Sequence, residues 1–200
     1  MYGIYENGAV IAKFTAPMTV RSNQPILVSD TLSLDRQTAA QAAQRWEIET
    51  GLEPLTAGSQ DLFVHLVTKG AVTTFDVLMP QNYGVILARS QKTSSGFATG
   101  ASRSTQVVLR NVLGFIPKGT FIQFGNHPKV YMTTNDRSNG QESLNIYPGL
   151  RVPVNDTEIK YGDDVIFKCR YDTDVVRGMV YSDGILMSTG SVRLVESLRG

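Results

Sequence analysis

The residue types that most often perform chemistry in proteins are sparse in this chain and lie far apart along it. The two histidines, His65 and His127, and the single cysteine, Cys169, occur in three unrelated segments. Their spacing fits no zinc site, and the chain contains no motif of a serine hydrolase, a zinc protease, a phosphate-binding loop or a dinucleotide-binding loop. We therefore predict no catalytic, cofactor-binding or metal-binding residue, and no enzymatic activity. The sequence assigns no role to these three residues.

The neighbouring carboxylates are the next candidates for chemistry. Asp163 adjoins Asp164, and Asp172 is close to Asp174. Both pairs flank a predicted strand at positions typical of turns, where solvated carboxylates far outnumber calcium ligands or catalytic pairs. Cys169 lies inside that strand, in the run VIFKCRY, which predicts a packed thiol rather than a reactive one.

The overall composition is that of a folded protein with balanced charge. Hydrophobic residues make up 42% of the chain, charged residues 18%, and the formal net charge is +1. These values argue against disorder and give no electrostatic reason to expect a strongly acidic partner. The apolar runs are shorter than the ~18 residues of a membrane helix. The N-terminal residues lack the pattern of a signal peptide, and one cysteine cannot form an intrachain disulfide, so we expect synthesis in a reducing cytoplasm.

The stretch that should organise the first part of the fold is residues 44–81, which is predicted to form a strand, a helix and a second strand. Residues 45–50 alternate, with Trp46 and Ile48 on one face and Glu47 and Glu49 on the other. Trp46 is predicted to be a core anchor. The second strand covers residues 73–79 and ends at Pro80.

The helix of this unit is predicted within residues 53–69, with Thr56 or Ser59 as its N-cap. Its apolar residues lie at helical spacing and should pack on a sheet. They are Leu62, Phe63, Leu66 and Val67. His65 lies off this stripe and is expected to be partly exposed.

The remaining N-terminal residues are predicted to be irregular strands. Residues 9–14 and 18–20 are short β segments interrupted by Pro17 and Pro25, which is typical of edge strands. Leu32 and Leu34 alternate with polar residues as in a half-buried strand. Residues 36–45 have high helix propensity but few large apolar residues to anchor a helix, so an extended stretch is favoured.

Residues 105–170 are predicted to form a second, smaller β unit. About five strands, separated by turns, indicate a small barrel similar to an OB-fold. The predicted strands are residues 106–110, 120–124, 128–134, 142–147 and 163–171. An Asn-Gly hairpin loop lies at 135–140 and a turn at 156–161. Residues 92–104 are rich in Ser, Gly and Thr, and are predicted to be a linker or a surface loop that reaches a partner.

The segments beyond residue 174 are predicted to return to the first unit. They are strands at 175–181, 185–187 and 191–198. The second unit would therefore be an insertion. If it is OB-like, basic and aromatic residues on one face could bind single-stranded nucleic acid. The candidates for that face are Lys118, Phe121, Phe124, Lys129, Tyr131 and Arg137.

Three groups of short motifs, taken in order, resemble one known family. First, the strand with Trp46 leads to the helix and then to Leu78-Met79-Pro80-Gln81. Second come Gly119-Thr120-Phe121, the HPKVY run at 127–131, and Ile146-Tyr147-Pro148. Third, Glu196-Ser197-Leu198 closes the last strand. This order resembles the distal tail protein family of long-tailed bacteriophages. The resemblance covers roughly residues 44–198 with gaps, and residues 1–43 add little to it. Because each motif alone is weak, the resemblance rests on their order.

The resemblance implies a mainly β fold with two domains and a structural role. An N-terminal β-sandwich or barrel-like domain with one short helix would comprise residues 1–84 with 175–200, and residues 85–174 would be the inserted OB-like barrel. Such subunits form a hexameric ring in the virion that connects the tail tube protein to the tail tip or baseplate hub protein, and side-fibre proteins dock on it. They have no cofactor, small-molecule substrate or membrane partner. The alternative function is a binding module for single-stranded nucleic acid or oligosaccharide.

Overall fold

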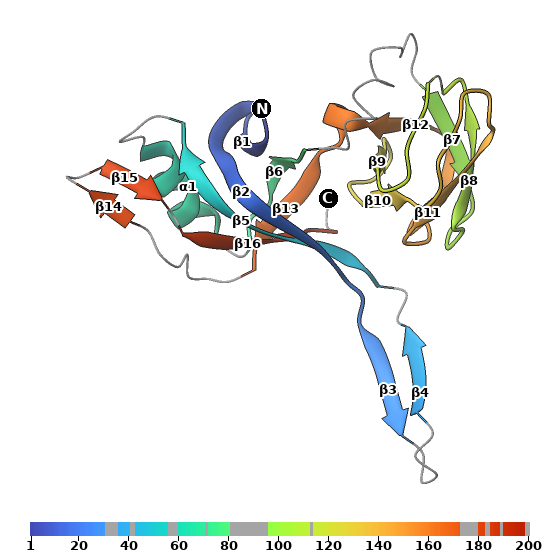
Figure 1. Cartoon of the computed structure of the whole chain (residues 1–200), viewed down its shortest axis with the longest axis horizontal. Helices are drawn as coiled ribbons and strands as arrows, with labels where there is room; N and C mark the ends of the chain where they lie inside the picture. The colour runs from blue at the N-terminus through green and yellow to red at the C-terminus, as the bar shows by residue number, and fades with distance from the viewer. Residues whose placement is uncertain are drawn as a thin grey trace.

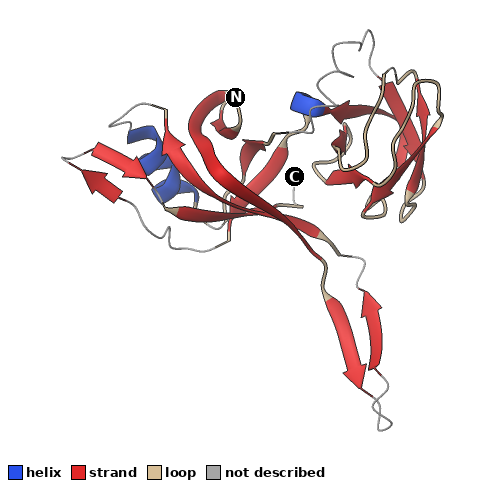
Figure 2. Cartoon of the chain, in the orientation of Figure 1, coloured by secondary structure: helices blue, strands red, loops and turns tan. Residues whose placement is uncertain are grey.

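The computed structural model of the chain describes residues 1–30, 36–40, 43–55, 60–70, 72–80, 96–112, 114–172, 180–182, 185–188 and 190–198. Within these ranges the protein is mainly β, as predicted, and contains one α-helix and two closed six-stranded barrels. The second barrel lies to one side of the first, and a hairpin projects from the long paired strands of the first barrel (Figure 1, Figure 2).

The first barrel combines strands from both ends of the chain. In order around the barrel, its strands are β1 (Gly3–Glu6), β2 (Ala9–Asn23), β5 (Arg45–Pro54), β16 (Ser191–Glu196), β13 (Phe167–Tyr171) and β6 (Phe75–Leu78). All neighbouring strands are antiparallel. The barrel therefore closes only when the chain returns from the second barrel.

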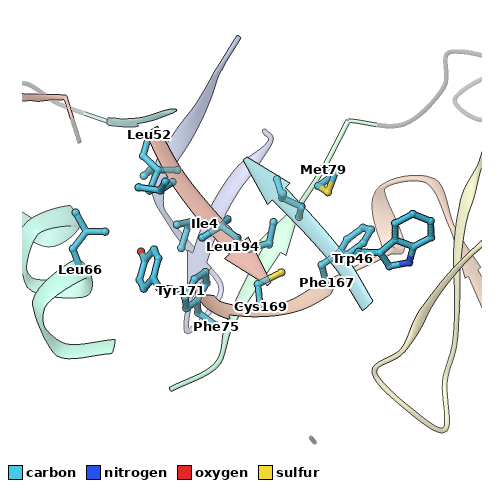
Figure 3. Close-up of a cluster of buried hydrophobic side chains, with 14 of the residues drawn as sticks. Ile4, Trp46, Leu52, Leu66, Phe75, Met79, Phe167, Cys169, Tyr171 and Leu194 are labelled. Atoms are coloured by element: carbon cyan, nitrogen blue, oxygen red, sulfur yellow. The ribbon is translucent and has the colours of Figure 1, made fainter. Parts of the chain in front are cut away.

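The predicted alternation of β5 is present and builds the centre of the first core. Trp46, Ile48 and Leu52 are all less than 5% exposed, and Ile48 lies opposite Leu194 of β16. Because side chains of a strand alternate between its faces, these residues point into the barrel together. Figure 3 shows Trp46 at one end of this core and Leu66 of the helix at the other.

Strand β2 is one long strand where two short edge segments were predicted. It pairs with β5 along most of its length, and the register shifts between Thr15 and Thr19. Pro17 lies inside this irregularity, where the missing N–H breaks no ladder hydrogen bond. The proline marks a bulge within a strand rather than the end of one.

The helix α1 (Gln60–Lys69) forms within the predicted range, but its buried face differs from the prediction. Leu62, His65 and Leu66 are buried, whereas Phe63 and Val67 are 38% and 63% exposed. The expectation of a partly exposed His65 was wrong because the helix packs on the barrel through a stripe rotated by about one residue. The predicted N-cap positions, 56 and 59, lie outside the described residues.

Two hairpins extend from the first barrel. Strands β3 (Ile26–Asp30) and β4 (Arg36–Ala40) pair with each other to form an arm that points away from both barrels (Figure 1). The extended structure predicted for residues 36–40 is confirmed, and Leu32 and Leu34 lie outside the described residues. Strands β14 (Val180–Ser182) and β15 (Ile185–Ser188) form the other hairpin, near α1 (Figure 1).

The second barrel has six strands where about five were predicted. Around the barrel they are β10 (Val130–Thr133), β11 (Ser143–Tyr147), β8 (Gln106–Arg110), β7 (Gly96–Gly100), β12 (Val154–Tyr161) and β9 (Phe121–Phe124). Strands β8, β9, β10 and β11 match predicted strands. In β8, Val107 and Leu109 are buried and Val108 is exposed, so the residues of this strand alternate between the inside and the outside of the barrel.

Strand β7 corrects the middle of the surface loop predicted at 92–104, whereas residues 101–104 form a turn that is mostly exposed and residues 92–95 lie outside the described residues. A side chain at Gly96 would lie 2.4 Å from a methyl group of Val112, and one at Gly100 would lie 2.7 Å from Leu150. The glycines therefore allow close packing inside the barrel rather than flexibility. The prediction failed because glycine and serine are common both in flexible loops and in strands that pack closely against their neighbours.

Two further corrections concern the end of the second unit. The turn predicted at 156–161 is part of β12, and the turn-forming residues accompany a register shift between Val154 and Thr157. Strand β13, predicted to belong to the second unit, pairs with β6 and β16 of the first barrel. The boundary placed at residue 174 is therefore too late, because the second barrel ends with β12 at Tyr161 and only the short 3-10 helix Gly162–Asp164 follows before the return.

Candidate functional site at the junction of the two barrels

The structure keeps the three residues that carry potential chemistry in separate surroundings. His65 lies between α1 and the first barrel, His127 lies in the second barrel just before β10, and Cys169 is fully buried in β13. Burial raises the pKa of the Cys169 thiol well above its usual value, so the packed thiol predicted from the sequence is what the structure contains. Across the described ranges, no three His, Cys, Asp or Glu side chains are grouped so that they could hold a metal ion.

His127 belongs to a chain of satisfied hydrogen bonds. The backbone N–H of Arg151 donates to the Tyr131 hydroxyl (3.0 Å), which donates to Nε2 of His127 (2.8 Å). Nδ1 of His127 then donates to Oδ1 of Asn126 (2.5 Å). Burial, with Arg151 and Lys129 nearby, lowers the pKa of His127, and burial raises the pKa of Tyr131 to about 12. The network holds a neutral imidazole in one tautomer and links the segments on either side of β10.

The carboxylate pairs also have structural surroundings. Asp163 and Asp164 form part of the 3-10 helix between the barrels, and Asp172 pairs with Arg193 of β16 at 3.2 Å. Asp174 lies outside the described residues.

The six residues proposed for a nucleic-acid face do not form one. Phe124, Lys129, Tyr131 and Arg137 are at most 3% exposed, and Phe121 packs against Trp46 and Phe167. Only Lys118 is an exposed member of the set. The other five residues of this set are therefore core and junction residues.

The most highly organised polar site is instead the junction between the barrels, centred on Glu196 at the end of β16. Its carboxylate accepts hydrogen bonds from the backbone N–H groups of Trp46 (3.1 Å) and Val130 (2.8 Å). It also accepts one from Nζ of Lys129 at 2.6 Å. Trp46 belongs to the first barrel, and Lys129 and Val130 belong to the second. One buried carboxylate thus holds groups from both.

Lys129 is the cation of this junction, and it is as deeply buried as its partner. Its ammonium group donates to Glu196 and to Oε1 of Gln44 (2.6 Å), and lies near the rings of Trp46 and Tyr131 at 5.8 and 6.0 Å. Burial lowers the pKa of Lys129, whereas the Glu196 carboxylate opposes that change. The side chains of Lys129 and Glu196 are 3% and 0% exposed, so neither presents a reactive group to solvent.

Trp46 adds an apolar layer to the same junction. Its Nε1 donates to the carbonyl oxygen of Val130 at 2.9 Å, and its ring meets Phe121 and Tyr147 edge-on, with centroids at 5.2 and 6.3 Å. The predicted burial of Trp46 is confirmed. It anchors the contact between the two barrels in addition to the core of one.

Two further polar contacts extend the junction in opposite directions. Gln123 of β9 donates to the carbonyl of Ile166 (3.0 Å), and its own amide oxygen accepts from the N–H of the same residue (3.3 Å), on the segment that leads back to the first barrel. The hydroxyl of Tyr147 in β11 lies 3.0 Å from the Ser22 hydroxyl and donates to Gln24 at the base of the arm. The junction therefore fixes the base of the arm as well as the two barrels.

The sequence contained one signal for this site that the predictions did not use. Val192, Leu194 and Glu196 share a phase in β16, and all three are buried. A carboxylate at an inward position of a strand requires a buried partner. The partner itself, 67 residues away along the chain, is not identifiable from sequence pattern.

Exposed apolar side chains gather on the arm and beside α1. Ile26, Leu27 and Val28 of the arm are 60%, 60% and 42% exposed. At the other end of the molecule in Figure 1, exposed apolar residues of α1 and β14 lie together, since Phe63 meets Tyr181 with ring centroids 6.4 Å apart. We call this second surface the helix patch, and it consists of Phe63, Val64, Val67, Val180 and Tyr181.

Comparison with known proteins adds no identification. No protein-family model matches the chain, and no curated protein matches it either. Among the described residues, no helix is both long enough and apolar enough to span a membrane.

Proposed function

We propose that this protein is a structural subunit of a bacteriophage tail that assembles into a ring, hexameric by its family resemblance, between the tail tube protein and the tail tip or baseplate hub protein. Its role is mechanical and has no catalytic step. It would be made in the cytoplasm of the bacterial host and end in the virion. Side-fibre proteins are further candidate partners.

The observation that carries this proposal is the projecting arm. A two-stranded hairpin is marginally stable by itself in water. This one carries three exposed aliphatic side chains in a row, Ile26, Leu27 and Val28, and points away from its own barrels (Figure 1). A hairpin of this kind gains stability when a neighbouring subunit covers it.

The distribution of apolar surface supports a ring rather than a two-fold dimer. The arm and the helix patch are different surfaces, and they lie in different parts of the molecule (Figure 1). Contact between unlike surfaces of identical subunits is head-to-tail, and such a contact generates a ring when the rotation closes. The rigid junction supports the same proposal, because it fixes the base of the arm relative to both barrels through Tyr147 and Gln24.

Light scattering after size-exclusion chromatography, followed by negative-stain imaging, tests the proposal on the full chain. We expect a concentration-dependent closed ring for the natural protein and loss of that ring for Leu27→Asp. Val152→Asp, a change at an exposed aliphatic residue of the second barrel, is the matched control and should retain the ring. A protein that stays monomeric at every concentration and binds single-stranded DNA with strong salt dependence would contradict the proposal and favour the alternative function.

A further inference from the structure

The contact between α1 and the first barrel is built around a buried histidine. His65 is 1% exposed, and its ring meets Phe75 of β6 and Tyr171 of β13 edge-on, with centroids at 4.9 and 6.0 Å. Leu62 and Leu66 bury their side chains on either side of it along the helix. Figure 3 shows Tyr171 between Leu66 and the interior of the barrel. His65 is therefore the polar centre of the surface through which α1 is attached.

Two polar atoms at this contact are not satisfied. Within the described part of the chain, Nε2 of His65 and the hydroxyl of Tyr171 are the buried side-chain atoms that lack a hydrogen-bond partner. Buried polar groups are nearly always hydrogen-bonded in native proteins, so each such atom weakens the packing around it. Both atoms occur where the helix meets the barrel, and this concentrates the weakness at one place.

The charged groups that face His65 give it limited support. Glu6 of β1 lies 3.4 Å from Nδ1 through Oε2, and its other oxygen pairs with Lys69 of the same helix at 2.5 Å. Tyr171 is the titratable group that faces the ring from β13, and β6 contributes the apolar Phe75. A protonated imidazole would share the Glu6 carboxylate with Lys69, and its second N–H, on Nε2, would lack a partner because Nε2 makes no hydrogen bond.

The direction of the pH effect follows from burial. Burial lowers the pKa of His65 below its ordinary value of 6.5, although Glu6 opposes the change. Because the detached helix exposes the ring to water, the detached state takes up a proton at a higher pH than the attached state. The attachment is therefore strongest above pH 6.5 and weakens as the pH falls from there towards the lowered pKa. Glu6 keeps its charge in this range, because its hydrogen bond with Lys69 lowers its pKa below 4.5.

We propose that His65 makes the attachment of α1 to the first barrel acid-sensitive, so that acidification releases α1 while the strands of both barrels stay paired. Release uncovers the buried faces of Phe75 and Tyr171, which then form a new apolar surface beside the helix patch. A detached ten-residue helix is not stable by itself, so release also unfolds it. This property does not depend on the ring proposed above.

Hydrogen–deuterium exchange of the full chain at about pH 7.5 and about pH 5 tests the proposal, with protection factors used to correct for the intrinsic effect of pH on exchange. We expect the protection of α1 amides to fall by up to about tenfold for each pH unit below 6.5, and that of β5 and β16 amides, whose strands contain no histidine, to stay unchanged. His65→Gln should remove this pH dependence. His127→Gln, which changes the only other histidine, should retain it.

Two results would overturn the proposal. One is an equal loss of protection in α1, β5 and β16, because that is global unfolding. The other is the same pH dependence in His65→Gln as in the natural chain. If His65→Gln does not fold, an NMR titration of the natural protein and of His127→Gln decides the question. An imidazole of His65 that titrates at or above its ordinary pKa would then exclude an acid-sensitive attachment.

Discussion

The junction between the barrels and the contact between α1 and the first barrel both bury titratable side chains, but they treat them in opposite ways. At the junction, the buried carboxylate of Glu196 accepts hydrogen bonds from an ammonium group and two backbone N–H groups. At the helix contact, His65 and Tyr171 each leave a buried polar atom without a partner. A satisfied polar network specifies one arrangement of its elements, whereas an unsatisfied one lowers the free energy needed to separate them.

This difference assigns different mechanical properties to the two contacts. The junction should move as one body with the base of the arm, since Lys129, Gln44 and Ser22 are joined by successive hydrogen bonds. The helix contact should be the first part of the first barrel to open. A protein that must hold a fixed shape, yet respond locally to its surroundings, can do both by placing its buried polar groups in these two ways.

The largest expected effect comes from breaking the junction. Glu196→Ala leaves the ammonium group of Lys129 buried without its carboxylate, and the N–H groups of Trp46 and Val130 without an acceptor. We expect a loss of about 3–5 kcal/mol in the free energy of unfolding, measured by urea titration. The double variant Lys129→Met with Glu196→Leu should recover part of this loss, because it removes the unpaired charge. A loss below about 1 kcal/mol for the single variant would show that the junction does not hold the barrels together.

A smaller effect is expected from replacing two buried tyrosines, one at each contact, by phenylalanine. Tyr131 and Tyr171 are 0% and 3% exposed, but only the Tyr131 hydroxyl is hydrogen-bonded. Tyr131→Phe should lower the free energy of unfolding by about 1–3 kcal/mol, because it leaves the groups that met the hydroxyl unpaired. Tyr171→Phe should leave stability unchanged or raise it by about 1 kcal/mol. Equal losses in thermal or urea unfolding would show that the hydroxyl of Tyr171 has a partner after all.

The smallest effect is expected for an exposed ion pair, which like Lys129–Glu196 joins a cation to a carboxylate but lies at the surface. Arg21 and Glu49 lie 3.3 Å apart, with side chains 61% and 45% exposed. Solvent screens such a pair, so Glu49→Ala should change the free energy of unfolding by less than about 1 kcal/mol. The same urea titration measures it beside Glu196→Ala. Similar losses for the two variants would mean that burial does not distinguish the pairs.

Features that depend on neighbouring residues in the chain could be predicted from the sequence. The β class, four strands of the second barrel and the strand–helix–strand order of residues 44–81 all follow from local alternation and helical spacing. Trp46 and Ile48 of β5 were placed on one face correctly because burial of one face of a strand repeats every second residue. Composition misled at Gly96 and Gly100 of β7, because glycine occurs in flexible loops but here allows close packing between strands.

The contacts that give the two regions their properties were decided by the tertiary structure alone. Strand β13 joins the first barrel because β6 and β16 are its partners, and they lie about 90 and 25 residues away along the chain. Lys129 meets Glu196, and His65 turns towards the barrel, for the same reason: no local pattern records which distant groups a folded chain brings together. The sequence by itself determined which residues form strands and a helix, and long-range packing determined which of their polar groups are satisfied.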